Sequence, residues 1–421
     1  MRERMSVWSA TAIGVGAMVG AGLFALLGQA ALRAGTNVPL VFAIGGVVAI
    51  LTGYSYAKLA ARFPGSGGIN IYFRESFGKS VLSGTMSILY YITIMVASAM
   101  IAQSFGKYAV ALAGLDDNGI APQAFAVGII LLLTVVNSIG TGHAGRLETL
   151  LVVFKLVVLG ILAVAGAAQM HSSLHVSYTP MPPSQLLSVV GLVFFAYAGF
   201  GTITNASGSV ADPSKTIPRS IYGAIIFVTG LYVALSIIVL GSVDPGGLAA
   251  HADTVIADAA KPLLGRAGFY AVVLAALAAT ASAINSNFFS ALQTLTGLGE
   301  HQQLPAFFNR LIWRNGTQGF FWSVGGVIIL SVTFDLSATA NMGSATFLMT
   351  YLGVQISHMR LRRQTGGSAF LIGLGSLSIA IVLISFLWQI SLTQPVSIIM
   401  IASFVGFAAC AEWLCLRLQP A

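Results

Sequence analysis

Charged residues are scarce in this chain: they make up 8% of its 421 residues, against about 25% in a typical soluble domain. No long hydrophilic segment interrupts the chain, so we expect no separate water-soluble domain. Hydrophobic residues account for 57% of the chain. This composition excludes an ordinary soluble protein and predicts a polytopic membrane protein.

Cysteine is almost absent, with only Cys410 and Cys415 present. They lie five positions apart on one predicted helix and do not face each other, so we expect neither a disulfide nor a metal site between them. The six histidines lie in or beside predicted loops without the spacing of metal ligands. We therefore predict no metal and no cofactor. We also predict no enzyme activity, because the predicted spans lack converging acid–base groups.

Apolar stretches long enough to cross a bilayer recur twelve times along the chain. The predicted spans are 8–32, 38–59, 82–105, 121–141, 147–168, 186–204, 221–243, 268–294, 319–334, 339–358, 369–389 and 394–416. The first is too long for the apolar region of a signal peptide, so we predict that it is retained as a span. The predicted fold class is an all-α integral membrane protein with twelve transmembrane helices.

Lysine and arginine gather on one side of these spans. With the N-terminus placed inside, fifteen of the twenty fall on the inner side, four fall outside, and Lys155 lies within a span. The positive-inside rule therefore predicts a multi-pass protein of the cell membrane with both termini in the cytoplasm. The same asymmetry explains the net charge of +8, which therefore does not indicate a nucleic-acid partner.

Glycines cluster in the first span, at Gly14, Gly16, Gly20 and Gly22. Each lowers helix stability by about 1 kcal/mol relative to alanine. We expect the helix to open at Gly20–Gly22. Broken backbone at membrane depth is tolerated only where it faces protein or a water-filled cavity. The freed N–H and C=O groups would then bind a small charged solute. The alternative is close helix packing, for which Gly16 and Gly20 have the right spacing.

The sixth span also has glycines near its middle, in Phe195–Gly201, before the sequence turns polar. Matching glycine-interrupted spans in two halves point to a transporter site. If spans one to five and six to ten are repeats, their odd number makes the second repeat inverted relative to the first. We predict a single transporter domain over 1–421, with a first repeat over 8–168, a second over 186–358 and two further helices over 369–416.

Three blocks of sequence go together: Gly16–Phe24, Tyr56–Gly68, and Phe195–Gly201 followed by Asp212–Arg219. In combination they resemble the amino acid–polyamine–organocation superfamily of permeases. The resemblance covers most of the chain, and the combination is specific although each block alone is weak. It implies an inverted 5+5 repeat with broken first and sixth helices, two additional helices, and alternating access around a central site.

The resemblance also implies a set of substrate-binding residues: Ala17, Met18, Gly20, Ala21, Gly22, Phe195, Ala196, Tyr197, Ala198 and Gly199. The N–H groups of residues 20–22 would hold the substrate carboxylate, since a half-helix N-terminus favours an anion. Freed carbonyls would hold its ammonium group: those of Ala17 and Met18 in the first span, and those of Phe195, Ala196 and Ala198 in the sixth. Phe195 and Tyr197 would form an aromatic wall or gate; the alternative for these two rings is packing against lipid or core.

Lys155 is the one basic residue well inside a predicted span. An intramembrane charge costs about 2.5–3.5 kcal/mol on insertion scales and is by default a functional residue, although the side chain could also snorkel to the inner surface. In some proton-coupled members of the superfamily, a lysine on the fifth helix stands where sodium-coupled relatives bind Na⁺. The resemblance thus implies that Lys155 contacts carbonyls of the first span and a hydroxyl of the eighth, for which Ser282 is the candidate. We therefore predict proton coupling without Na⁺.

The predicted binding region contains no acid to pair with a second cationic group, and no arginine to pair with an acidic one. Several members of the superfamily carry glutamates where this chain has Gly201 and Gly208. Mechanisms that relay protons through those two acids are therefore excluded for this chain. We predict a neutral L-amino acid, carried by proton symport, with the bilayer as the only other partner and no obligate protein partner. Amino acid exchange and a permease for polyamines or cationic amino acids remain alternatives; a channel and a transporter-like sensor are less favoured.

Overall fold

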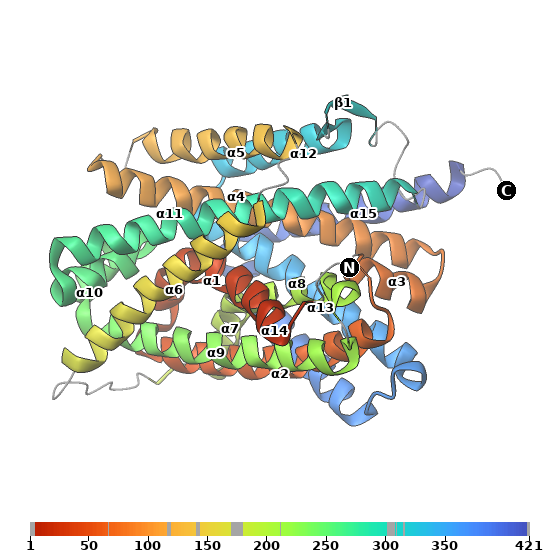
Figure 1. Ribbon diagram of the computed structural model, residues 1–421, viewed down its shortest axis with the longest axis horizontal. Coiled ribbons are helices and arrows are strands. Elements are labelled where there is room, and N and C mark those ends of the chain that lie inside the picture. Colours follow the sequence, from red (N-terminus) through yellow and green to blue (C-terminus); the bar gives the residue numbers. More distant parts are fainter. Residues whose placement is uncertain are drawn as a thin grey trace.

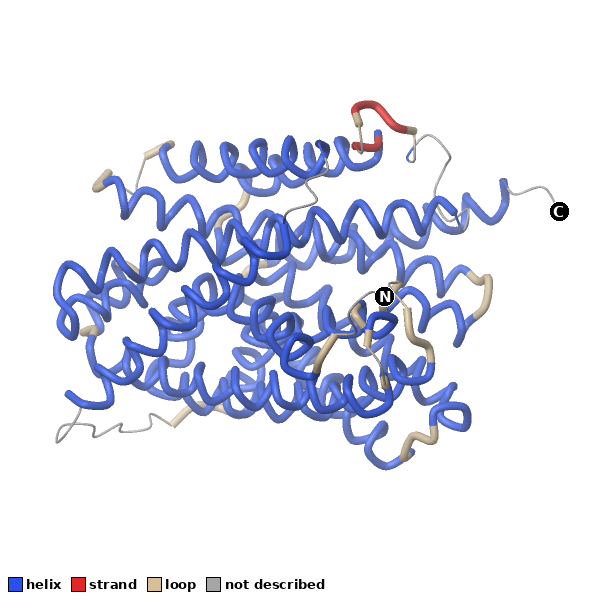
Figure 2. The backbone as a smooth tube through the Cα atoms, viewed as in Figure 1, coloured by secondary structure: helices blue, strands red, loops and turns tan. Residues whose placement is uncertain are grey.

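The computed structural model describes residues 5–65, 67–115, 119–139, 144–169, 180–210, 212–300, 308, 310–314 and 316–418, without the side chains of 21, 144–149, 245, 296–300 and 418. Within these ranges the chain is almost entirely helical (Figures 1 and 2). The strands there are β1 (Leu311–Trp313) and β2 (Gly316–Thr317), a short antiparallel pair. The all-α fold is confirmed.

Each of the twelve predicted spans lies on helix. In chain order the helices are α1 (Val7–Ala34), α2 (Val38–Arg62), α4 (Val81–Ala113), α5 (Ala121–Ile139), α6 (Ala144–Gln169), α7 (Pro183–Tyr197), α9 (Pro213–Ser242), α11 (Val255–Glu300), α12 (Gln318–Thr333), α13 (Leu336–Thr365), α14 (Ala369–Thr393) and α15 (Pro395–Leu418). Shorter elements join them: η1 (Gly35–Asn37), α3 (Ile69–Phe77), η2 (Ala198–Gly201), α8 (Thr202–Asn205), η3 (Ser207–Ser209), α10 (Pro245–Ala250) and η4 (Ala252–Thr254).

Nine stretches of the described residues are long and apolar enough to cross a membrane. This number is below twelve for three reasons. The C-terminal part of α1, from Gly22, and α2 count as one stretch, α12 is a shorter apolar helix, and α13 carries many polar residues. The helices themselves match the predicted spans.

Helix ends coincide with residues suited to end a helix. Ser80 caps the start of α4 by accepting a hydrogen bond from the Ser83 amide, and Asp335 caps α13 in the same way. Gly114 and Gly366 end these two helices in the left-handed conformation, which favours glycine. Local sequence therefore sets these boundaries.

The sixth span changes helix type where the interruption was predicted, although residues 183–209 remain one helical stretch. The α-helix α7 ends at Tyr197, and the chain continues through the 3₁₀ turn η2 into the short helix α8. The hydroxyls of Thr202 and Thr204 donate to the carbonyls of Gly199 and Gly201, at 2.8 and 2.7 Å. The Gly199 carbonyl also accepts from the Thr202 amide, so the threonine hydroxyls add to the backbone hydrogen bonds of this turn.

The first span differs from the prediction, because α1 is a single helix that continues through Gly20–Gly22. The backbone does not open there. The glycines serve close packing instead: a Cβ atom on Gly22 would lie 2.2 Å from the Cα of Ala196 on α7. Small residues allow this backbone approach, and the packing it permits offsets the low helix propensity of glycine.

The helices form one bundle with α1 and α7 at its centre. In Figure 1, α5 and α12 lie along one long side and α2 and α9 along the opposite side. The helix α3 and the last turns of α15 lie at one end of the bundle, and α10 lies at the other. The helix α1 packs against α7, α9 and α11, so the two glycine-rich segments meet inside the protein.

Candidate functional site

A cavity of about 700 Å³ lies where α1 crosses α7 and η2. Its volume is in the range of small-molecule binding sites. Six of the predicted site residues line it: Ala17, Gly22, Phe195, Ala198, Gly199 and Ser282. The two glycine-rich segments therefore contribute to one cavity, as the sequence predicted, although the backbone of α1 stays helical.

The cavity is bordered by a close contact between two stretches of backbone. A Cβ atom on Gly199 would lie 2.6 Å from the amide nitrogen of Met18 and 2.7 Å from the carbonyl carbon of Ala17. Together with the contact between Gly22 and Ala196, this brings α1 and the α7–η2 segment within van der Waals distance at two places. Peptide groups, rather than side chains, thus form much of the wall at the crossing.

Other predicted residues lie behind this wall. Met18, Gly20, Ala196, Tyr197 and Lys155 are not among the residues that line the cavity, and the side chain of Ala21 lies outside the described part of the chain. The first five residues belong to the packing around the crossing.

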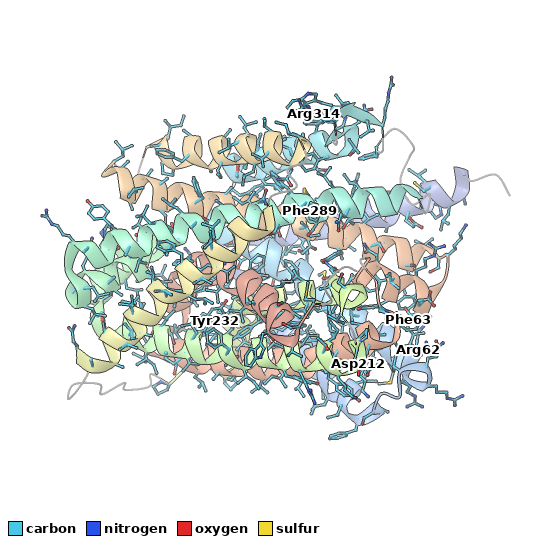
Figure 3. The ribbon with its side chains drawn as sticks, in the orientation of Figure 1. Arg62, Phe63, Asp212, Tyr232, Phe289 and Arg314 are labelled. Atoms are coloured by element: carbon cyan, nitrogen blue, oxygen red, sulfur yellow. The ribbon has the colours of Figure 1, made fainter. Side chains whose placement is uncertain are left out.

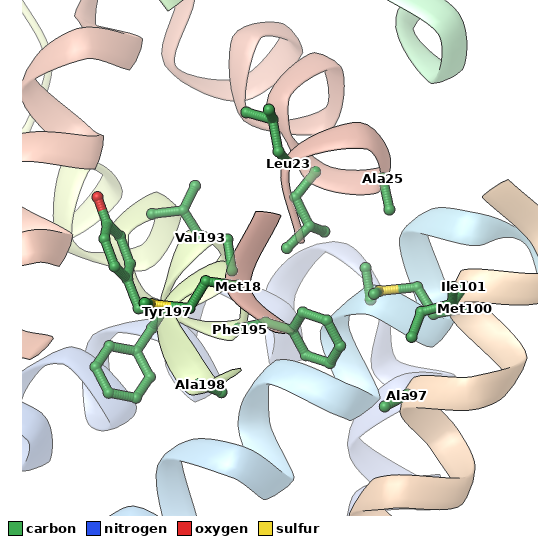
Figure 4. Packing of buried hydrophobic residues seen from close by; sticks show 14 of the residues in the cluster. Met18, Leu23, Ala25, Ala97, Met100, Ile101, Val193, Phe195, Tyr197 and Ala198 are labelled. Carbon is green, nitrogen blue, oxygen red and sulfur yellow. The ribbon is translucent and has the colours of Figure 1, made fainter. Parts of the chain in front are cut away.

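Tyr197 does not form the aromatic wall expected of it. Its hydroxyl donates to the carbonyl of Phe42 on α2, at 2.7 Å, and Figure 4 shows Phe195 and Tyr197 pointing in different directions. Residues two apart on a helix face nearly opposite sides, so both rings cannot line one cavity. The aromatic residues that line the cavity are Phe195 and five rings from other helices: Tyr56, Tyr90, Phe289, Phe347 and Tyr351.

Hydroxyls from other helices hydrogen-bond to carbonyls at the crossing. Tyr232 on α9, seen in the interior in Figure 3, donates to the carbonyls of Met18 and Ala196, at 2.7 and 3.2 Å. Tyr351 on α13 donates to the carbonyl of Ala198. Three of the carbonyls expected to hold the substrate ammonium are therefore bonded to tyrosine.

Replacing Tyr232 by phenylalanine should lower the stability of the protein by about 1–3 kcal/mol, because it leaves two buried carbonyls without this donor. Thermal unfolding of the purified protein in detergent measures the effect. Tyr270→Phe, at an exposed position of α11, is the control and should unfold like the unsubstituted protein. Equal unfolding temperatures for Tyr232→Phe and Tyr270→Phe would contradict the role of the Tyr232 hydroxyl.

Lys155 on α6 is buried, with 1% of its surface exposed, so its side chain does not snorkel to the inner surface. Its Nζ donates to the carbonyl of Gly16 at 2.7 Å, the contact with the first span that the resemblance implied. A Cβ atom on Gly20 would lie 3.6 Å from the same Nζ. The ammonium group thus lies against the glycine-rich face of α1.

A polar wall on α11 faces the crossing. It includes Ser282 and Asn285, and the Nδ2 of Asn137 on α5 donates to the Oδ1 of Asn285 at 2.9 Å. Asn137, like the five additional aromatic rings, was not singled out from the sequence. These residues lie on long apolar helices or in a block noted only for family likeness, where no local pattern marks the side that faces a cavity.

Comparisons with known proteins agree with this architecture. A family profile described as amino acid permease matches residues 5–411. The chain belongs to the amino acid permease family. It is 39% identical to the inner membrane transport protein YbaT of Escherichia coli (strain K12), over 92% of this chain and 90% of that protein.

Two further relatives extend the comparison. An uncharacterized protein of Methanocaldococcus jannaschii is 31% identical over 87% of this chain and 84% of its own length. Cationic amino acid transporter 9, chloroplastic, of Arabidopsis thaliana is 25% identical over 73% of this chain and 57% of that protein. The permease is therefore a multi-pass membrane transporter and not an enzyme, and the superfamily resemblance is confirmed.

Proposed function

We propose that this permease carries a neutral L-amino acid across the cell membrane by alternating access, coupled to protons and independent of Na⁺. The observation that carries the proposal is the chemistry of the cavity. No Asp, Glu, Lys or Arg is found among its described lining residues. A substrate with a charged side chain would be desolvated there without a counter-charge, which is unfavourable, whereas a neutral side chain needs none.

The two main-chain charges of such a substrate would be met by peptide groups. Gly22 and Ala17 on α1, and Ala198 and Gly199 on η2, line the cavity with little side-chain cover. Because α1 is helical at Gly20–Gly22, carboxylate capture by those amides requires a local opening of the helix. Binding and a change in α1 are thus linked in this proposal.

The inverted repeat is part of the proposal, and the packing of the helices supports it. Helices in equivalent positions of the two halves pack in pairs: α1 with α7, α2 with α9, and α4 with α11. Contacts between non-equivalent helices are also reciprocal. The helix α1 packs on α9, and its counterpart α7 packs on α2. Likewise α6 packs on α11, and its counterpart α13 packs on α4. A two-fold axis relating 8–168 to 186–358 would produce this pattern, with 369–416 added outside the repeats.

We propose the orientation of the protein in the membrane from the positions of its charged residues. Arg62 and Asp212 lie toward the same end of the bundle as α3 and the last turns of α15 (Figures 1 and 3). The three-arginine group Arg360, Arg362 and Arg363 ends α13. Placing this end in the cytoplasm satisfies the positive-inside rule and puts both termini inside.

Proton coupling is proposed for Lys155. Its protonated amine can hold the Gly16 carbonyl, whereas loss of the proton weakens that bond and removes the charge beside Gly20. A proton gained on one side and lost on the other would thereby be linked to movement of α1 relative to α6. Ser282 lines the cavity on α11, from where its hydroxyl would assist the amine.

Purified permease in liposomes tests the proposal. Each of the twenty standard L-amino acids is first screened for thermal stabilisation, and uptake of those that stabilise is then measured under imposed pH and Na⁺ gradients. We expect neutral amino acids to stabilise the protein, a pH gradient to drive uptake, and replacement of Na⁺ by choline to change nothing. Uptake that requires Na⁺, or that occurs only in exchange for amino acid loaded inside the liposomes, would contradict proton symport. Thermal stabilisation by lysine or arginine alone would favour a cationic substrate.

A further inference from the structure

Two tyrosines from different helices line the cavity beside the η2 interruption: Tyr56 on α2 and Tyr351 on α13. The Tyr351 hydroxyl donates to the carbonyl of Ala198. The Tyr56 hydroxyl is buried and has no hydrogen bond of ordinary geometry, although the Tyr351 hydroxyl lies near enough to interact with it. A buried hydroxyl without a partner is unfavourable, so its presence at a cavity indicates a partner gained in another state.

The two rings are placed to exchange a hydrogen bond. Their centroids are 4.7 Å apart, and both rings pack against Phe200, at 5.2 and 5.4 Å. A Cβ atom on Gly201 would lie 2.9 Å from the Tyr351 hydroxyl oxygen and 3.4 Å from the Cε1 of Tyr56. The glycine therefore leaves the space beside both rings open.

The bond to Ala198 differs from the other hydroxyl–carbonyl bonds of the interruption. Thr202 and Thr204 bind carbonyls three residues before them in the same segment, so these bonds move with η2. Tyr232, which binds Ala196, is not among the residues that line the cavity. Tyr351 comes from another helix and faces the cavity, so a solute in the cavity can replace it.

We propose that Tyr56 is a positioning residue of the substrate site, which accepts the Tyr351 hydroxyl when the substrate ammonium takes the Ala198 carbonyl. An ammonium N–H then donates to Ala198, and the Tyr351 O–H donates to the Tyr56 oxygen; each proton stays on its own atom. No buried group loses its partner in the exchange. This role rests on the proposed function, because it requires a substrate that carries an ammonium group.

The exchange also has a structural consequence. In this structure Tyr351 links α13 to η2, and after the exchange it would link α13 to α2. The interrupted segment would then be free to move relative to α13 once the substrate is bound. Substrate binding would be coupled to the backbone of the sixth span through one hydrogen bond.

A double-mutant cycle tests the exchange. The probe is whichever of the twenty standard L-amino acids gives the wild-type permease its largest thermal stabilisation, and its dissociation constant is measured in detergent. Tyr56→Phe should weaken binding about 10-fold, since the displaced Tyr351 hydroxyl is left unpaired. In the Tyr351→Phe background nothing needs to be displaced, so adding Tyr56→Phe should change the constant by less than roughly twofold.

Two further variants keep the test informative. Gly201→Ala places a methyl group against Tyr351 and should weaken binding as Tyr56→Phe does, while Tyr270→Phe on the exposed face of α11 should bind like wild type. Equal binding by Tyr56→Phe and wild type would overturn the role of Tyr56. The role would also be overturned if Tyr56→Phe weakened binding equally in the wild-type and Tyr351→Phe backgrounds, because an equal loss of affinity indicates a structural effect only. If wild type binds none of the twenty amino acids, the proposed function itself fails, and the exchange fails with it.

Discussion

Replacing Lys155 by alanine should abolish uptake driven by a pH gradient while the protein keeps its fold. The variant removes a charge-assisted hydrogen bond to the Gly16 carbonyl, and such bonds contribute about 1.5–3 kcal/mol, which corresponds to roughly a 10- to 150-fold change in an equilibrium. Alanine fits the space because it is smaller, and it removes an expensive buried amine. Uptake of the amino acid in liposomes, with and without an inward proton gradient, measures the effect.

Lys155→Arg separates the proton from the positive charge. Arginine keeps the charge but does not release a proton in proteins, so this variant should bind substrate and yet show no response to the pH gradient. Lys261→Ala, at an exposed lysine near the start of α11, is the matched control and should behave like wild type. If Lys155→Ala retains pH-driven uptake, Lys155 is not the coupling residue.

Replacing Gly22 by valine should remove transport and lower the unfolding temperature. The first added carbon would lie 2.2 Å from the Cα of Ala196 and 3.2 Å from its carbonyl carbon, so backbone rather than a flexible side chain must move. Overpacking a well-packed interior costs about 1–3 kcal/mol, and displacing a neighbouring backbone places the expected cost at the upper end of that range. Thermal unfolding in detergent and uptake in liposomes report the two effects separately.

Gly160→Val provides the comparison. Gly160 lies on α6, and a Cβ atom there would meet no atom within 4 Å. The same substitution should therefore leave both stability and uptake close to wild type. Comparable losses in the two variants would show that valine disturbs these helices wherever it is placed, and would remove the case for a specific contact between α1 and α7.

Composition and apolar run length were sufficient to predict a helix at each of the twelve ranges, although several of the helices extend beyond them. A span must be about twenty apolar residues long to cross the hydrocarbon, so the twelve predicted ranges could be read directly from the chain. Glycine and polar residues also marked the sixth span as interrupted, because η2 and α8 begin where the apolar run ends. Lys155 could be singled out from the sequence because a charge in a span is rare.

Tertiary structure decided which side chains face the cavity. In the membrane the helices are apolar on all sides, so the periodic pattern that shows the buried face of a soluble helix is weak. Phe195 and Tyr197 looked equivalent in the sequence, and only the rotation of α7 against α2 separates the ring that lines the cavity from the one bound to Phe42.

Tertiary contacts also decided whether the first span opens or stays helical. Its glycines lower helix propensity, which by itself favours an opening, but the contact of Gly22 with Ala196 and the bonds that Lys155 and Tyr232 make to α1 come from residues far away in the chain. The sequence by itself determined the class, the spans and the two glycine-rich segments, since these depend on local composition. The helical path of α1 and the pairing of Tyr56 with Tyr351 were decided by the tertiary structure, because both depend on contacts between helices distant in the chain.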